Sequence, residues 1–299
     1  MKKKEFSVVV PATTANLGPG FDSVGIALSE YMTVEVRSSN EWNVIYRESI
    51  FQDLATDQTN LIIQTMMNVA QRYQRQMNPQ QLLISSSIPL GKGFGSSASA
   101  IAAGIVIADE LLSLQLSDEQ KVLLGCLYEG HADNVSAALL GGIVVNYFDG
   151  KTVDYLHVTE ADVAFVALIP PKILKTTESR GLLPAILPHK EAVRSSTANG
   201  LLTAALIQNN WQLVGKMMEK DLLHERFRKT ILPYFDDIRR VSKRIDAYGM
   251  SISGAGPSLM IAVKRGEEGN VEECLTEMFP YYEGMILYPS LQGAVVSRK

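Results

Sequence analysis

The chain has 299 residues, of which 46% are apolar, and its formal net charge is −4. This length is sufficient for two domains, and the composition allows a sizeable buried core. The weak negative charge argues against a general nucleic-acid-binding protein, and no apolar run approaches the length of a membrane span.

The first residues do not have the pattern of a signal peptide, because only the short run 6–10 is apolar before Pro11. The lysines at 2–4 are predicted to form a solvated tail. Cys126 and Cys274 are isolated from each other in apolar helical contexts, which predicts buried, reduced thiols. We therefore expect a cytoplasmic protein.

A loop rich in glycine, asparagine, aspartate and proline is predicted at 11–25, after a short strand that ends at Pro11. Asn60 is assigned to capping the helix that follows it rather than to a nucleotide contact. The other elements of the first half are predicted from hydrophobic periodicity and capping residues. They are strands at 28–38, 42–46 (a candidate to pair with 28–38), 81–88, 143–148 and 152–158, and helices at 61–76, 100–112, 117–128 and 135–140.

A glycine-rich stretch leads from a strand into an apolar helix, and it reads Pro89-Leu90-Gly91-Lys92-Gly93-Phe94-Gly95-Ser96-Ser97-Ala98-Ser99. Alternate glycines allow close approach of the backbone, and the first turn of a helix offers free N–H groups and a positive dipole end. Together they predict an anion site, most often for phosphate. It is not a Walker A loop, because Gly93 follows Lys92, and it is not a dinucleotide fingerprint, because Ser96 stands where glycine is needed.

A short polar stretch at 159–162 is the predicted boundary between an N-terminal domain, 1–160, and a C-terminal domain, 161–299. In the second half a loop is predicted at 176–184. The other elements are strands at 163–169, 250–254 and 258–263, with one or two more within 285–297, and helices at 190–209, 211–220, 234–248 (closed by Gly249) and 271–278. Strands and helices mix without a strict βαβ alternation, which predicts an α+β fold.

Three glycine-bearing sites lie at 11–25, 89–100 and 253–258. In this order and spacing they resemble the three signature motifs of the GHMP kinases, a family of small-molecule kinases. The resemblance implies an N-terminal α+β domain that carries the phosphate loop and a ferredoxin-like C-terminal domain, with substrate bound between them. It also implies ATP and Mg²⁺ as cofactors and, as a family-level expectation, a homodimer.

Within the family, the patterns at 11–22, 130–135, 176–184 and 224–228 resemble those of homoserine kinases. The resemblance implies phosphorylation of the side-chain hydroxyl of L-homoserine to O-phospho-L-homoserine, a step of threonine biosynthesis. It assigns contacts with the amino acid to Asn16, Asp22, His131, Asn134, Thr176, Arg180 and Arg228. The chemistry agrees, because arginine forks suit a carboxylate, Asp22 suits an ammonium group, and asparagine amides can hold a hydroxyl.

The nucleotide contacts implied by the resemblance are Pro89, Leu90, Gly91, Lys92, Gly93, Phe94, Gly95, Ser96, Ser97, Ala98, Ser99, Gly254 and Gly256. Ser97 and Glu129 are the candidate Mg²⁺ ligands, because both offer hard oxygen donors. Lys92 either touches a phosphate or faces water. Asp133 either acts as a general base or caps a helix, and our hypothesis is that positioning by Asn134, without a strong base, accounts for most of the rate.

Two alternatives stay open at this point. One is a GHMP kinase for another alcohol, such as mevalonate, a sugar or shikimate. A neutral sugar, however, needs no arginine clamp, whereas Arg180 and Arg228 together with Asp22 suit an amino acid. The other is a non-catalytic ATP-binding relative, which would be free to lose Ser97 and Glu129.

Overall fold

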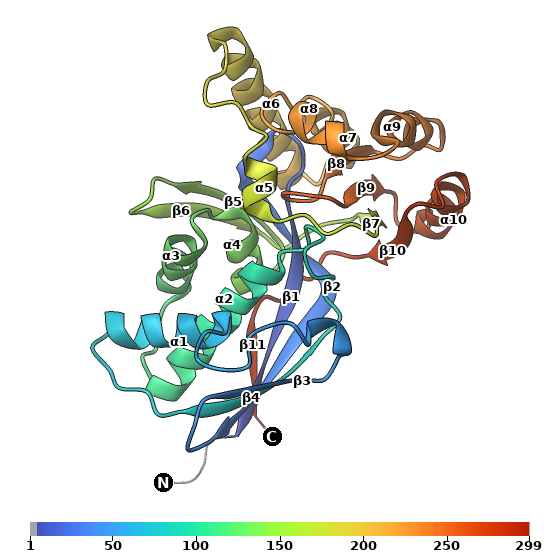
Figure 1. The fold of residues 1–299 in the computed structure, drawn as a ribbon. Helices are drawn as coiled ribbons and strands as arrows, with labels where there is room; N and C mark the ends of the chain where they lie inside the picture. The colour runs from blue at the N-terminus through green and yellow to red at the C-terminus, as the bar shows by residue number, and fades with distance from the viewer. Residues whose placement is uncertain (1–4, 299) are drawn as a thin grey trace.

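The chain forms two β-sheets that carry helices on their outer faces, in a computed structural model that describes residues 5–298. The lysine run at 2–4 therefore lies outside the described residues. The two sheets stand next to each other, and the ends of the described chain lie together at the far edge of the first sheet (Figure 1). None of the helices within 5–298 combines the length and the apolar character that crossing a membrane requires.

The first sheet has the order β11-β1-β2-β4-β3, with β5 paired to β2 and β6 to β5. Neighbouring strands run antiparallel except β3 and β4. β11 comes from the end of the chain and places Arg298 opposite Phe6 of β1. The strands are β1 (Phe6–Asn16), β2 (Gly20–Ser38), β3 (Asn43–Tyr46), β4 (Gln80–Ser86), β5 (Ile143–Phe148), β6 (Val153–Val158) and β11 (Val295–Arg298).

One face of this sheet is covered by α1 (Leu61–Arg72), α2 (Ser96–Leu112), α3 (Asp118–Glu129) and α4 (Asp133–Leu140). α2 is the central helix, since it contacts α1, α3, α4 and β1. Its residues from Ala98 to Ala108 are almost all buried, as its apolar composition predicts. A capping box of Ser117 and Gln120 opens α3, and the side chain of Asn60 caps α1, as predicted, by accepting from the N–H of Ile62.

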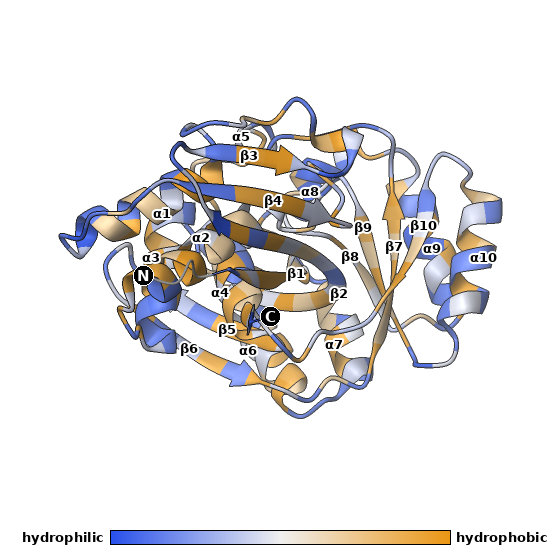
Figure 2. Ribbon diagram, turned by 90° about the horizontal axis from the view of Figure 1, so that it is seen from below, coloured by the Kyte–Doolittle hydropathy of each residue, from blue (hydrophilic) through white to orange (hydrophobic). Residues whose placement is uncertain are grey.

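The second sheet has the order β10-β7-β9-β8 and is antiparallel throughout. This order, with helices after the first and third strands, is the β-α-β-β-α-β arrangement of a ferredoxin-like fold. Figure 2 shows that β7 is hydrophobic along its length, and all six of its residues are buried. The strands are β7 (Ala164–Ile169), β8 (Gly249–Ile252), β9 (Leu259–Val263) and β10 (Glu283–Leu287).

Most helices of the second half lie between β7 and β8 along the chain. They are α5 (Thr176–Arg180), α6 (His189–Ile207), α7 (Trp211–Met218), α8 (Glu225–Arg228), α9 (Phe235–Arg244) and, between β9 and β10, α10 (Glu268–Met278). A 3-10 turn at Lys229–Ile231 follows α8, and another, at Ser49–Phe51, lies in the first half between β3 and α1. Cys126 is buried as expected, while Cys274 on α10 is only partly buried.

The predicted loop at 11–25 is wrong, because β1 continues to Asn16 and β2 begins at Gly20. Pro11 does not end the strand. It lies at a shift in register between β1 and β2, where a missing N–H is tolerated. The polar threonines that follow are satisfied by distant partners: Thr13 Oγ1 donates to Asn134 Oδ1 (2.8 Å), and Thr14 Oγ1 lies 2.9 Å from Ser253 Oγ.

Three smaller predictions were also wrong. The strand at 42–46 pairs in parallel with β4 instead of with 28–38. The predicted loop at 176–184 contains the short helix α5. The helix predicted at 234–248 ends at Arg244, and Gly249 begins β8 instead of closing the helix.

Candidate functional site

The glycine-rich stretch forms the turn between β4 and α2, and α2 begins at Ser96. Gly91, Gly93 and Gly95 all have positive φ, which glycine adopts without strain. The absence of a side chain also lets the loop approach another part of the protein. A Cβ on Gly93 would lie only 2.3 Å from the backbone oxygen of Ser253. The loop is therefore held against the turn that follows β8.

A cavity of about 390 Å³ lies where this loop meets the β1–β2 turn, the start of α4, α5 and the turn after β8. All seven residues predicted to contact an amino-acid substrate line it: Asn16, Asp22, His131, Asn134, Thr176, Arg180 and Arg228. So do most of the predicted nucleotide contacts, namely Leu90, Gly91, Gly93, Phe94, Gly95, Ser96, Ser97, Gly254 and Gly256. One concave site thus gathers residues from both halves of the chain.

Of the predicted nucleotide contacts within the described chain, Pro89, Lys92, Ala98 and Ser99 do not line the cavity. Ser99 is fully buried, and its hydroxyl donates to the carbonyl of Pro11. Lys92 Nζ donates to the carbonyls of Pro170, Pro171 and Lys172 at 2.6, 2.6 and 3.0 Å. Lys92 therefore ties the phosphate loop to the segment after β7, which differs from both interpretations of its sequence position.

We expect Lys92→Met to lower the free energy of unfolding by about 1–3 kcal/mol, because three carbonyls lose their donor, while kcat changes only a few-fold. Urea unfolding and steady-state kinetics measure the two effects. Lys229→Met is the control, since Lys229 forms an exposed ion pair with Asp236 that is worth about 0–1 kcal/mol. A hundred-fold loss of kcat without loss of stability would instead place Lys92 on a phosphate.

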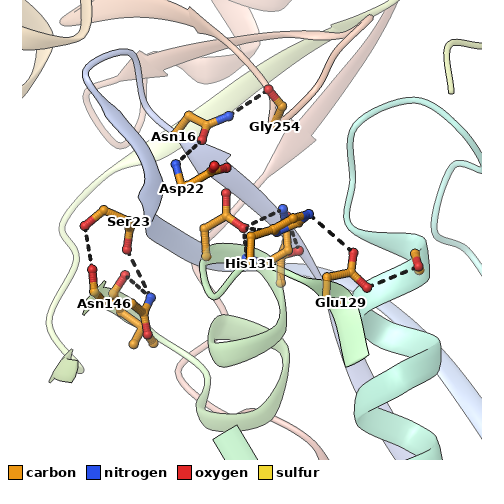
Figure 3. A network of polar contacts seen from close by, with 12 residues as sticks. Asn16, Asp22, Ser23, Glu129, His131, Asn146 and Gly254 are labelled. Carbon is orange, nitrogen blue, oxygen red and sulfur yellow. Dashed lines mark hydrogen bonds and ion pairs between the residues drawn. The ribbon is translucent and has the colours of Figure 1, made fainter. Parts of the chain in front are cut away.

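The first residues of α4 form a buried polar network. Asp133 is the first helical residue, not the N-cap, which is Ala132. Its Oδ1 atom accepts from the N–H of Asn134 at 2.8 Å and lies 2.7 Å from His131 Nδ1 and 3.3 Å from Asn134 Nδ2. On its other side, His131 lies next to Glu129, as Figure 3 shows, and the Oε1 atom of Glu129 lies 4.0 Å from His131 Nε2. The site thus holds an alternating chain of acidic and basic groups.

The contacts within this network shift the pKa values of its three titratable residues, Glu129, His131 and Asp133. Burial works against charge on His131, but the hydrogen bond and charge of Asp133, together with the charge of Glu129, outweigh it and raise the pKa of His131. Burial also disfavours ionised Asp133, yet its contacts with His131 and Asn134 prevail and its pKa is lowered. The pKa of Glu129 is raised, mainly by burial. Both shifts favour the charged forms, so the 2.7 Å contact between His131 and Asp133 is an ion pair whenever His131 is protonated.

A raised pKa in the folded state means that the stability contributed by His131 is fully present below its unfolded pKa of about 6.5 and is lost as pH rises through its folded pKa. We expect His131→Gln to cost about 1.5–3 kcal/mol at pH 6, with the cost shrinking at higher pH. Urea unfolding from pH 6 to pH 9 measures it. His157→Gln, at an exposed position on β6, serves as control. A pH-independent cost would contradict the ion pair.

Two sets of residues could hold a metal ion. Ser97 Oγ donates to Glu129 Oε2 at 3.2 Å, so the predicted Mg²⁺ ligands do lie together, at the start of α2 and the end of α3. Asp22, His131 and Asp133 also each offer an atom within 4.8 Å of the others. The first pair fits a hard cation better, because in the second His131 and Asp133 bind each other and Asp22 binds Arg180.

Residues from the two halves meet across the mouth of the cavity. Arg180 on α5 forms a two-pronged ion pair with Asp22 at the start of β2, at 2.6 and 3.0 Å. Asn16 accepts from the N–H of Asp22 and donates to the carbonyl of Gly254, as Figure 3 shows. These contacts hold two charged groups of opposite sign side by side in the lining of the cavity.

Phe21 lies in the site although the sequence around it does not indicate a functional role. Its ring lines the cavity and lies 5.5 and 5.4 Å from the guanidinium carbons of Arg180 and Arg228, within the range of a cation–π contact. The only local signal was its place beside Asp22. Thr177 and Lys175 also line the cavity and were not singled out.

Comparisons with known proteins point to one family. Residues 60–142 match the sequence profile of the GHMP kinases N terminal domain, and 202–280 match GHMP kinases C terminal. The chain is 40% identical to a homoserine kinase of Bacillus velezensis over 293 residues, covering 98% of this chain and 95% of that protein. It is 44% identical to one of Bacillus cereus over 274 residues, covering 91% and 90%. The crystal structure of homoserine kinase from Cytophaga hutchinsonii superposes with a TM-score of 0.87 at 26% identity, covering 99% of this chain and 98% of that one.

Proposed function

The chain belongs to the GHMP kinase family, and from this premise we propose that it transfers the γ-phosphoryl group of ATP to the side-chain hydroxyl of L-homoserine. The product is O-phospho-L-homoserine. The full-length relatives support this substrate over mevalonate, a sugar or shikimate, and they support an active kinase over a non-catalytic relative. The use of ATP supports a cytoplasmic location.

One observation favours a substrate that carries a carboxylate over a neutral sugar. Arg228 is only 2% exposed, yet its hydrogen-bond partners within the described chain are uncharged, namely His224 Nδ1 and the carbonyl of Gly254, each at 3.1 Å. Burial lowers the pKa of Arg228 to about 10, so it stays cationic at neutral pH. A buried cation without an anionic partner is costly, and a substrate carboxylate would supply that partner. Asp22 would bind the ammonium group of the same amino acid.

The phosphates of ATP would bind the N–H groups of the loop and the first turn of α2. A second cavity of about 360 Å³ shares Leu90, Ser96 and Ser97 with the first and suits the nucleoside. Its wall includes the stacked rings of Tyr46 and Phe51, 5.8 Å apart, which provide an apolar surface for a base. The base therefore enters between α1, β3 and the phosphate loop.

Ser97 and Glu129 would hold Mg²⁺. The Glu129 carboxyl group is mostly buried and near Asp133, and both the burial and the negative charge of Asp133 disfavour its ionised form. A cation bound there would offset this unfavourable energy. The metal supplies neutralisation of phosphate charge. Asn134 lies between the loop and the amino-acid contacts, and Thr13 fixes its orientation by donating to Oδ1. The protein residues thus align the hydroxyl with the γ-phosphate, which is the main requirement of phosphoryl transfer.

Asp133 is poorly suited to accept the proton of the hydroxyl. Its pKa is lowered, and Oδ1 already accepts hydrogen bonds from neighbouring groups. We expect Asp133→Asn to reduce kcat by less than about 100-fold, below the upper range of acid–base contributions. Single-turnover kinetics with a folding check by circular dichroism test this. A loss on the order of 10⁴-fold or more would make Asp133 the general base.

A panel of alcohols tests the proposed function. L-Homoserine, mevalonate, shikimate and a hexose are assayed by coupled detection of ADP, and each product is identified by mass. We expect the highest kcat/KM with L-homoserine. Turnover of mevalonate but not of homoserine would contradict the substrate, and ATP binding without ADP formation from any alcohol would contradict the kinase activity.

A further inference from the structure

His224 precedes α8 and is fully buried, and no role in the proposed reaction requires it. It touches two parts of the amino-acid site. Its Nε2 atom lies 3.0 Å from the carbonyl oxygen of Gly18 in the β1–β2 turn, and its Nδ1 atom lies 3.1 Å from Arg228 Nη1. Its ring also stacks on Phe21, with centroids 5.1 Å apart. The histidine therefore bridges the turn that leads into β2, where Asp22 lies, and the arginine expected to bind carboxylate.

The partners determine the protonation state of His224. A carbonyl can only accept, so Nε2 carries the hydrogen, and an arginine can only donate, so Nδ1 must keep its lone pair. The imidazole is therefore neutral in the Nε2–H tautomer. Burial, the largest influence, lowers the pKa of His224 and agrees with this state.

The contacts of Arg228 explain how the neutral His224 affects the arginine. Nη1 has two hydrogens, and both are used, one by His224 Nδ1 and one by the carbonyl of Gly254. The Nε atom is buried and has no partner within residues 5–298. Nε and Nη2 form the parallel donor edge that matches a carboxylate. Fixing Nη1 therefore leaves this edge for a ligand.

We propose that His224 is a positioning residue for recognition of the substrate carboxylate: as a neutral acceptor bound to the β1–β2 turn, it orients Arg228 so that its Nε–Nη2 edge receives the carboxylate. This inference rests on the proposed function and adds to it a specificity role outside the substrate-contacting residues. His224 touches neither the substrate nor ATP in this account.

Three substitutions of His224 separate its hydrogen-bond donor, its hydrogen-bond acceptor and its flat ring. His224→Phe keeps a flat ring beside Phe21 but removes both polar contacts. His224→Gln can keep a donor to Gly18 but loses the acceptor at the Nδ1 position. His224→Asn can keep an acceptor at that position but loses the donor. The acceptor is the part that the proposal requires, so Asn should rescue and Gln should not.

The measurement is KM and kcat for L-homoserine, for 3-aminopropan-1-ol, which lacks the carboxylate, and for ATP. For Phe and Gln variants we expect KM for homoserine to rise about 10- to 100-fold, the scale of a hydrogen bond to a charged group, with kcat, KM for ATP and turnover of the amino alcohol within about threefold. The Asn variant should stay within about threefold for all substrates.

Equal losses with homoserine and the amino alcohol would show a merely structural role and overturn the inference. An Asn variant as impaired as the Phe variant would overturn it also. If the wild-type enzyme used neither substrate, the proposed function itself would fail. If it used homoserine and the variants kept their preference for the carboxylate, only the role of His224 would fail.

Discussion

Replacement of Gly95 by alanine is expected to lower kcat/KM by at least about 100-fold, the cost of moving catalytic groups by about 1 Å. Gly95 caps α2 with φ of +67°, at the point where the phosphate loop becomes helix. A Cβ there would lie 1.9 Å from Thr13 Oγ1 and 3.1 Å from Asn134 Oδ1. The methyl group would displace the threonine that orients Asn134, and it would shift the N–H groups expected to bind phosphate. ADP release in a coupled assay measures the loss.

Gly150→Ala is the matched control. Gly150 has φ of +88° in the β5–β6 turn, and no atom lies within 4 Å of the position that a Cβ would take there. Both variants carry the backbone strain of alanine at positive φ, about 1–2 kcal/mol, but only Gly95→Ala creates a collision in the site. We expect Gly150→Ala to keep kcat/KM within about threefold of wild type. Full activity of Gly95→Ala would show that the loop does not need its observed geometry.

Arg228→Met is expected to lower kcat/KM for L-homoserine by about 10²–10³-fold, the usual cost of truncating one partner of a buried charge pair. The effect should lie mainly in KM for homoserine, while KM for ATP changes only a few-fold, because Arg228 lines the part of the cavity that also holds Asp22 and Arg180. Initial-rate kinetics with each substrate varied in turn provide the test.

Two further variants test whether the effect of Arg228→Met is specific to the guanidinium group at this position. Arg226→Met removes a cation two residues away on α8, but Arg226 is partly exposed and pairs with Glu191, so activity should be close to wild type. Arg228→Lys keeps the positive charge but lacks the planar fork, and it should recover only part of the affinity. A rise in KM for ATP with unchanged KM for homoserine would assign Arg228 to the nucleotide instead.

The fold could be predicted where local pattern decides it. The capping box at Ser117, the Asn60 cap and the apolar α2 follow from nearby residues, and the structure confirms them. The stretch 11–25 could not be predicted in this way. Its glycines and polar residues resemble a loop, but Thr13 and Thr14 are accommodated in a strand by partners more than a hundred residues away. Tertiary contacts therefore outweigh local propensity there.

The candidate site shows the same division. The residues of each sequence motif are close together in the chain, so the motifs could be recognised from the sequence. The structure places residues of these motifs around one cavity. The partners of Lys92 are backbone carbonyls, which carry no signature in the sequence. Phe21 and His224 depend on stacking between the start of β2 and the residue before α8, and neither residue signals that contact in its own segment. Side-chain roles that arise between segments are the part that local reasoning misses.

The pairing of β11 with β1 has a consequence for biosynthesis. A chain leaves the ribosome from its amino terminus, so β1 emerges early and β11 only after the strands of the second sheet. Until then one edge of β1 exposes unpaired N–H and C=O groups, which can pair with a neighbouring nascent chain. The amino-terminal sheet therefore gains its last strand only after the second sheet has been synthesised, late in translation.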